Sequence, residues 1–291
     1  MKFVNPKNDL AFKKIFGNEK QKEILISFLN AILDLKGAFE IQTIHILNPY
    51  QMPHLVDLKE SSLDVRATDK RGVTFIIEMQ VEQKPFLRQR FSFYVAKAYS
   101  SQIERAVDYP KLNKVIFIGI FDFKEFNNEH YLSHHMTLNC ETLEQDLREM
   151  EYNFIELPKF NKKESELKTI LDKWIYFLKH AEDLETIPKY AKQTQVLKTA
   201  YEIADRFNWS KQELEAIEYW EMREQANRNA AFEKGEKQGM KKGLKMGKED
   251  GLKEGQQQKA LETACKMLAK GYNLAEITEL TGLSPTDLAT L

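Results

Sequence analysis

The sequence is poor in several features that would assign it to a particular class of protein. Its 291 residues include two cysteines, Cys140 and Cys265, which lie too far apart to indicate a disulfide framework or a zinc site. It has no run of about 18 apolar residues, the length that a membrane-spanning helix needs. The first residues also lack the apolar stretch of a signal peptide. We therefore expect a cytoplasmic protein that carries reduced thiols and does not contact a membrane.

An excess of charge of either sign is also absent. The chain has 43 Lys and Arg residues against 44 Asp and Glu residues, which gives a net charge of −1. Overall composition therefore does not indicate a nucleic-acid-binding protein, and any such surface must come from local clusters of Lys and Arg. With 42% hydrophobic residues, the chain is long enough for one large domain with appendages or for two domains.

Residues 63–80 (LDVRATDKRGVTFIIEMQ) predict a β-hairpin, because apolar and polar residues alternate on both sides of a turn. The segment Lys70-Arg71-Gly72 suits a three-residue loop in which Gly72 takes the left-handed conformation. Counting back from this loop places Asp64 directly opposite Glu78. A two-residue turn at Lys70-Arg71 would place Asp64 on the other face, but it needs two non-glycine residues at positive φ.

In the preferred register, Asp64 and Glu78 share one face of the hairpin, and Gln80 lies two residues further along it. Carboxylates that face each other across two strands repel, so they either hold a cation together or spread into solvent. Oxygen ligands of this kind favour a hard divalent cation such as Mg²⁺, or Mn²⁺ or Ca²⁺. The other interpretation is a pair of solvated carboxylates on an exposed sheet face.

The remaining segments predict an α/β fold. Residues 114–121 are nearly all apolar, as in a strand buried on both faces, and residues 85–108 have helical periodicity. Together with the second hairpin strand they form a right-handed strand–helix–strand unit. We expect the helix on one face of a mixed sheet and the carboxylates on an exposed row near a sheet edge. Other strands are expected at 41–47, 131–138 and 152–157, the last two at sheet edges, and other helices at 9–16, from Asn18, at 164–180, at 193–207 and from Ser210.

Four segments, taken in order, resemble one family of nucleases. Asp64, followed after about fourteen residues by Glu78-Met79-Gln80, resembles the D…(E)xK signature of the PD-(D/E)XK nucleases, with Gln80 in the lysine position. Residues 8–17, 91–99 and 108–123 are similar to the recombination-promoting nuclease and transposase family of that superfamily, in which an ExQ variant is usual. The similarity covers residues 5–160 and extends loosely into the helices beyond.

The resemblance implies a PD-(D/E)XK-like mixed sheet flanked by helices and a metal-dependent DNA endonuclease activity, linked to DNA recombination or to mobile elements. It implies that Asp64 and Glu78, with a backbone carbonyl near Met79, hold Mg²⁺. An amide can neither act as a base nor carry positive charge, so Gln80 cannot take over these roles of a lysine. It would instead orient the attacking water or the phosphate. The alternatives are an inactive DNA-binding or assembly protein on the same fold, and an RNA nuclease.

Three further residues have two interpretations each. Asp9 matches an early acidic position that lies near the metal in these nucleases, but it also suits the N-terminus of a helix. The family resemblance makes Arg90 a candidate for contacting phosphate or for bracing the active-site carboxylates. Lys13, on the polar side of its helix, is a candidate for facing a phosphate. Arg90 could instead cover apolar surface with its stem, and Lys13 could be a solvated charge.

Six glycines recur at every fourth position over residues 235–255. On a helix they form a smooth strip that would allow close approach of a second subunit, which predicts a homo-oligomer. The other interpretation of residues 231–258 is a flexible charged linker. Residues 259–291 resemble a helix-turn-helix, but the last helix has no Arg, Lys, Asn or Gln to read a base edge. This favours a packing or dimerisation unit. The predicted domains are a nuclease core at 1–160, helices packed on it at 161–230, the glycine segment and this tail.

Overall fold

The computed structural model describes residues 2–47, 50–51, 61–62, 64–103 and 112–288. The chain forms two compact units, one over Met1–Glu221 and one over Met222–Leu291. The first unit contains the sheet and the candidate site, and the second is helical.

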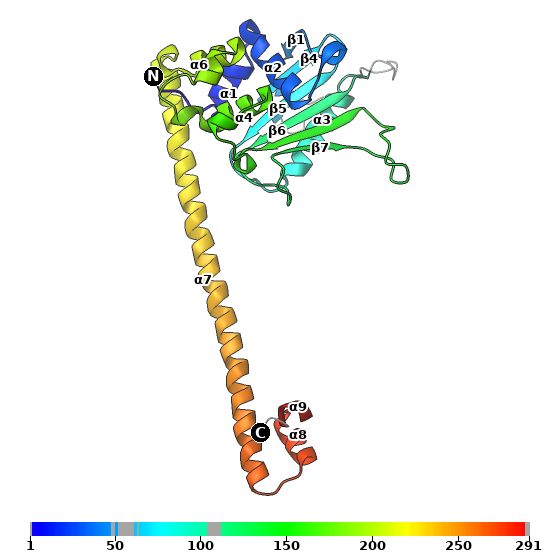
Figure 1. Ribbon diagram of the computed structural model, residues 1–291, viewed down its shortest axis with the longest axis vertical. Helices are drawn as coiled ribbons and strands as arrows, with labels where there is room; N and C mark the ends of the chain where they lie inside the picture. Colours follow the sequence, from blue (N-terminus) through cyan, green and yellow to red (C-terminus); the bar gives the residue numbers. More distant parts are fainter. Residues whose placement is uncertain (1, 48–49, 52–60, 63, 104–111, 289–291) are drawn as a thin grey trace, which may run out of the picture. The chain divides into compact units, whose positions relative to one another are not determined.

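A six-stranded mixed sheet forms the centre of the first unit, with the strand order β1-β4-β5-β6-β8-β7 (Figure 1). β5 and β8 both run parallel to β6, and the other neighbours are antiparallel. The strands are β1 (Ile44–Leu47), β4 (Val65–Asp69), β5 (Thr74–Gln80), β6 (Val115–Phe121), β7 (Leu132–Met136) and β8 (Met150–Glu156). A separate pair consists of β2 (Tyr50–Gln51) and β3 (Ser61–Ser62). The sheet confirms the predicted α/β class.

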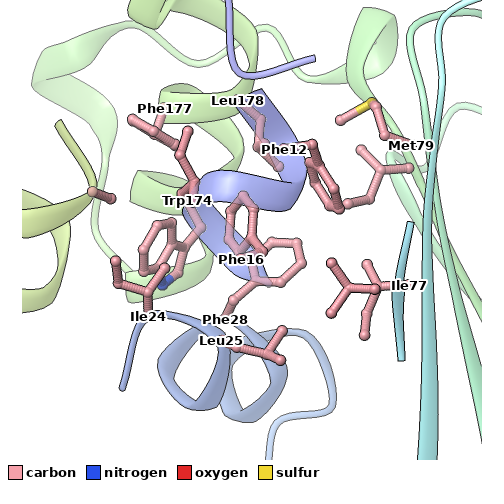
Figure 2. Packing of buried hydrophobic residues seen from close by; sticks show 14 of the residues in the cluster. Phe12, Phe16, Ile24, Leu25, Phe28, Ile77, Met79, Trp174, Phe177 and Leu178 are labelled. Atoms are coloured by element: carbon pink, nitrogen blue, oxygen red, sulfur yellow. The ribbon is translucent and has the colours of Figure 1, made fainter. Parts of the chain in front are cut away.

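One face of the sheet is covered by helices from both ends of the unit (Figure 1). Asn8 caps the first helix by accepting hydrogen bonds from the backbone N–H groups of Leu10 and Ala11, and Gly17 follows its last residue. Aromatic side chains of these helices pack around Trp174 and against Ile77 and Met79 of β5 (Figure 2). The helices are α1 (Asp9–Phe16), α2 (Lys22–Ile32), α4 (Ile170–His180), α5 (Lys189–Lys192) and α6 (Gln195–Ala204).

The other face is covered by α3 (Leu87–Ser100), which connects β5 to β6 as the sequence predicts. Phe91 and Val95 of this helix pack against Ile76 and Phe117 in a second hydrophobic cluster. The predicted helix extended to residue 108, but residues 104–111 lie outside the described part of the chain.

Two predictions about sheet edges are wrong. The carboxylate row was expected to be exposed near an edge, but Glu78 is only 3% exposed and β5 lies inside the sheet. The reason is that β4 and β1 extend the sheet beyond β5. The strand at 152–157 was also expected at an edge, yet β8 lies between β6 and β7. Alternating polarity shows that a strand is partly buried, but it does not identify the strand's neighbours.

The predicted hairpin register is confirmed. Val65 pairs with Ile77, so the same count places Asp64 opposite Glu78. The Asp69 N–H donates to the Val73 carbonyl across the loop at 3.1 Å. Gly72 has φ +82°, the left-handed conformation that the three-residue loop requires. An added Cβ at Gly72 would also lie 2.6 Å from the Asn113 side chain.

The longest helix, α7 (Lys211–Ala269), is continuous over 59 residues, so the glycine segment is helical. It begins after Ser210, which forms the predicted capping box with Glu213. An added Cβ at any of the six glycines of residues 235–255 would meet nothing within 4 Å. Among the described residues, no helix has both the length and the apolar character needed to cross a membrane.

In the second unit, the end of α7 packs with two short helices around a small core. α8 (Leu274–Thr281) ends at Gly282, which has φ +69°, and α9 (Pro285–Leu288) follows. The buried residues of this core are Ala264, Ile277, Leu283 and Leu288. A capping box between Asn273 and Glu276 begins α8.

Candidate active site

Asp64 and Glu78 are held together by hydrogen bonds that cross from one hairpin strand to the other. The Asp64 N–H donates to Oε1 of Glu78 at 3.2 Å, and the Met79 N–H donates to Oδ2 of Asp64 at 2.8 Å. Each carboxylate therefore accepts from the backbone of the opposite strand. The amide of Gln80 donates to Oε2 of Glu78 at 3.3 Å. The three residues of the D…ExQ motif thus form one connected group.

Both carboxylates are shielded from solvent, which disfavours their charged forms. The Asp64 side chain is 14% exposed, and Glu78 is almost fully buried. Burial, reinforced by a hydrogen bond and negative charge from Asp9, raises the pKa of Asp64 to about 7. Burial and the negative charge of Asp64 raise the pKa of Glu78 well above its usual value. Paired acids with raised pKa values are characteristic of functional sites.

Lys13 brings a positive charge to this pair from α1. Its Nζ lies 2.9 Å from Oδ1 of Asp9, one turn earlier on the same helix, and 3.7 Å from Oδ1 of Asp64. Burial lowers the pKa of Lys13, but the hydrogen bond and charge of Asp9 outweigh burial and raise it overall. Burial likewise raises the pKa of Asp9, but hydrogen bonds with Asp64 and Lys13 outweigh it and lower the pKa. Asp9 and Lys13 are therefore charged at neutral pH.

Arg90 reaches the same area from α3, on the other side of β5. Its Nη2 and Nε donate to the hydroxyl oxygen of Tyr94 at 3.0 and 3.3 Å. Its positive charge lowers the pKa of Glu78, although burial has the larger, opposite effect. Arg90 therefore acts electrostatically on the carboxylate pair while its guanidinium is held by Tyr94.

The carboxylate pair suits a magnesium ion better than a metal held entirely by protein ligands. Within the described part of the chain, no group of three or more His, Cys, Asp or Glu residues is arranged to hold a metal. Mg²⁺, however, commonly uses one or two carboxylates and completes its shell with water and substrate phosphates. Asp64 and Glu78 supply two such groups, and burial together with a neighbouring carboxylate raises the pKa of each, so a bound cation would offset the cost of ionising them. The residues present therefore fit a divalent cation.

All six residues selected from the sequence come together at one place, although they come from α1, from the position just before β4, from β5 and from α3. Sequence reasoning did not link Asp9 and Lys13 to each other, although their four-residue spacing on a helix indicates such a pair. It also gave no role to Arg66, which lies two residues after Asp64 on the same face of β4. The alternation of the strand already placed Arg66 beside the carboxylates.

A mixed sheet with a carboxylate pair on adjacent hairpin strands is the arrangement of a PD-(D/E)XK nuclease. The family model described as "PD-(D/E)XK nuclease family transposase" matches residues 6–234. The chain therefore belongs to the PD-(D/E)XK nuclease family transposases. A second model, the C-terminal helix-turn-helix domain of the Rpn/YhgA-like nuclease family, matches residues 257–291. No curated protein and no solved structure matches the chain.

The second match bears on whether the C-terminal tail packs against the protein or binds DNA. Sequence reasoning favoured a packing or dimerisation unit, because the last helix carries no residue suited to reading a base edge. The matched domain is a helix-turn-helix, a class that suggests DNA binding. In the described residues α9 spans Pro285–Leu288 only, and residues 289–291 lie outside them.

Proposed function

We propose that the protein is a Mg²⁺-dependent DNA endonuclease that hydrolyses phosphodiester bonds. The observation that carries this proposal is the buried Asp64–Glu78 pair, which the hairpin register holds on one face of the sheet. Membership of a nuclease family and a matched helix-turn-helix domain support it. The word transposase in the family description supports a link to DNA recombination or mobile elements.

In this proposal Asp64 and Glu78 hold the cation in their ionised forms, with a backbone carbonyl near Met79. A bound Mg²⁺ supplies an acidified water and neutralises charge on the scissile phosphate. Gln80 fixes the orientation of Glu78 through its amide hydrogen bond and has an amide oxygen that can accept from water. Asp9 holds Lys13 toward the pair.

Lys13 compensates for the missing lysine of the signature. Gln80 cannot carry a positive charge, whereas Lys13 places its ammonium 3.7 Å from Asp64. Arg90 sets a second positive charge on the opposite side of Glu78. These two residues are the proposed contacts to the substrate phosphate, because each can interact with an anion as well as with the carboxylates.

The experiment that tests this proposal is cleavage of supercoiled plasmid with Mg²⁺, Mn²⁺, Ca²⁺ or EDTA. Asp64→Asn and Glu78→Gln keep side-chain shape and remove the charge that holds a cation, so both should abolish metal-dependent nicking. Glu151→Gln is the matched control, since it neutralises a partly buried carboxylate on β8 that pairs with Lys114. Nicking that persists in both site variants would rule out the assigned residues.

The substitution of glutamine for lysine at position 80 gives one observation in favour of the inactive alternative. A protein that binds DNA but never nicks it, with any of the three metals, would support that alternative. Parallel digestion of a DNA and an RNA strand of the same sequence separates the DNA nuclease from the RNA nuclease. Cleavage of RNA alone would replace the proposed substrate while leaving the site in place.

We also propose that the glycine strip of α7 contacts a second copy of the chain. The helix is continuous through all six glycines, and an added Cβ at each of them lies in open space. Six glycines weaken a helix by about 5 kcal/mol relative to alanine, so a close helix–helix contact would offset that cost.

A further inference from the structure

Arg66 lies on the same face of the sheet as the candidate active site. It pairs across the hairpin with Ile76, whose side chain belongs to the cluster under α3. Asp64 and Glu78 lie one pleat further along the same two strands, so all three residues face the same side. Asp64 and Arg66 are two positions apart along the strand, so their Cα atoms are separated by roughly 6.5–7 Å, a distance on the scale of one nucleotide step.

Among the residues that the structure describes, no carboxylate pairs with Arg66. Its Nε is buried and has no hydrogen-bond partner among the residues that the structure describes. Burial lowers the pKa of this guanidinium. Three of the other arginines form ion pairs: Arg71 with Asp69 at 2.6 Å, Arg88 with Glu125 at 2.6 Å and Arg206 with Glu218 at 2.7 Å. A half-buried cation without a partner destabilises the fold, because desolvation is not offset by an ion pair.

An uncompensated guanidinium beside a hydrolytic site indicates an anionic ligand. Guanidinium groups bind phosphate through two parallel N–H donors, and their weaker hydration makes them suited to partly buried positions. We propose that Arg66 binds a phosphodiester of the nucleic-acid strand next to the one cleaved at Asp64 and Glu78. This inference rests on the proposed nuclease function for the position of the scissile phosphate. The contact between Arg66 and a phosphate itself requires only that the bound nucleic-acid strand crosses this face of the sheet.

The test compares Arg66→Met with Arg71→Met in the full-length chain. Both variants lose one positive charge from the same hairpin, but Arg71 is already paired with Asp69. Binding of a fluorescein-labelled 20-base-pair DNA duplex is measured by anisotropy in EDTA over a range of salt concentrations. We expect Arg66→Met to bind about 10-fold more weakly and to reduce the slope of log K against log salt by about 0.9. Arg71→Met should retain the wild-type affinity and slope.

Thermal unfolding of the same variants distinguishes a ligand-binding role from a structural one. Methionine keeps the apolar stem and removes an uncompensated charge, so Arg66→Met should have an unchanged or higher Tm. A lower Tm together with an unchanged salt slope would overturn the proposal and make Arg66 a structural residue. Equal losses of affinity in both variants would also overturn it, because the effect would then be one of net charge.

The binding measurement on Arg66→Met does not depend on whether the protein cleaves nucleic acid. If wild-type protein binds DNA without nicking it and Arg66→Met alone reduces the slope, the phosphate contact stands and the nuclease proposal fails. If wild-type protein nicks plasmid and Arg66→Met does so with unchanged KM and kcat, the nuclease proposal stands and the phosphate contact fails. In an active enzyme we expect a higher KM with little change in kcat, since Arg66 does not contact the reacting atoms.

Discussion

Asp172 shows how a single buried carboxylate can stabilise the start of a helix. Its side chain is 1% exposed and accepts hydrogen bonds from the backbone N–H groups of Lys168 and Thr169, both at 3.1 Å. Lys162 pairs with its other oxygen at 2.6 Å. Burial raises the pKa of Asp172, but these hydrogen bonds and the charge of Lys162 outweigh burial and lower the pKa overall. The ionised form is therefore favoured in the folded state.

The lowered pKa predicts a pH-dependent contribution to stability. In the unfolded chain the pKa of an aspartate is about 3.9, so the contribution is fully present above that pH. It is lost as the pH falls through the lower folded-state pKa. We expect Asp172→Asn to reduce the free energy of unfolding by about 1–3 kcal/mol at pH 7 and by less at pH 3, as measured by urea denaturation. Asp183→Asn, at a 69% exposed side chain, should show little effect at either pH.

Gly119 in β6 lies where the packing leaves no room for a side chain. A Cβ at this position would lie 2.8 Å from Phe154 and 3.0 Å from Phe121, inside the aromatic cluster under α3. We expect Gly119→Ala to destabilise the protein by about 1–3 kcal/mol in denaturant unfolding. Gly243→Ala makes the same chemical change on α7, where nothing lies within 4 Å, and should not destabilise it. Equal effects in the two variants would argue against the overpacking explanation.

At the scale of elements, the hairpin was predictable because its information is local. Alternation fixed the strands, and the requirement for a left-handed residue at Gly72 fixed the loop and therefore the position of Asp64 opposite Glu78. The burial of Glu78 was not predictable in this way. It depends on β1, which pairs with β4, and on α3, which packs over the sheet face on which Glu78 lies. The sequence of residues 63–80 does not indicate either contact.

The glycine strip of α7 leads to a prediction about association. Replacing Gly239, Gly243 and Gly247 with alanine should raise the helix content seen by circular dichroism, since each glycine costs about 0.8–1.0 kcal/mol relative to alanine. If the strip contacts a second copy, the added methyl groups should also weaken self-association in analytical ultracentrifugation. Wild-type and triple-alanine protein with the same association constant would contradict the proposed contact. A double alanine substitution at exposed Lys241 and Lys245, which lie on another row of the helix, serves as the control.

At the scale of the whole molecule, the site depends on contacts between segments far apart in the chain. Lys13 reaches Asp64 because Phe12 and Phe16 anchor α1 in the core against β5 (Figure 2). Sequence reasoning could select Asp9 through a family resemblance and Lys13 through its place on the polar side of a helix. It could not show that they meet the carboxylates, because that depends on how an entire helix packs on the sheet.

The division into two compact units predicts the outcome of limited proteolysis. The lysines of residues 234–253 are exposed on α7, and this part of the helix contains a glycine at every fourth position. Such a helix opens locally more easily than the core, so trypsin should cut there early. We expect mass spectrometry to find a fragment that begins at the N-terminus and ends within this segment. Intact α7 after the core has been digested would contradict this expectation.

The symmetry of the hairpin limits which changes in length the site can accept. Asp69 lies five positions after Asp64 on one arm, and Glu78 lies five positions after Val73 on the other. An insertion in the loop at residues 70–72 leaves both arms equal, so the carboxylates still face each other. One residue inserted into a single arm turns one carboxylate to the opposite face of the sheet, beside the core of α1. Related proteins should therefore vary in the loop while keeping the two arms the same length.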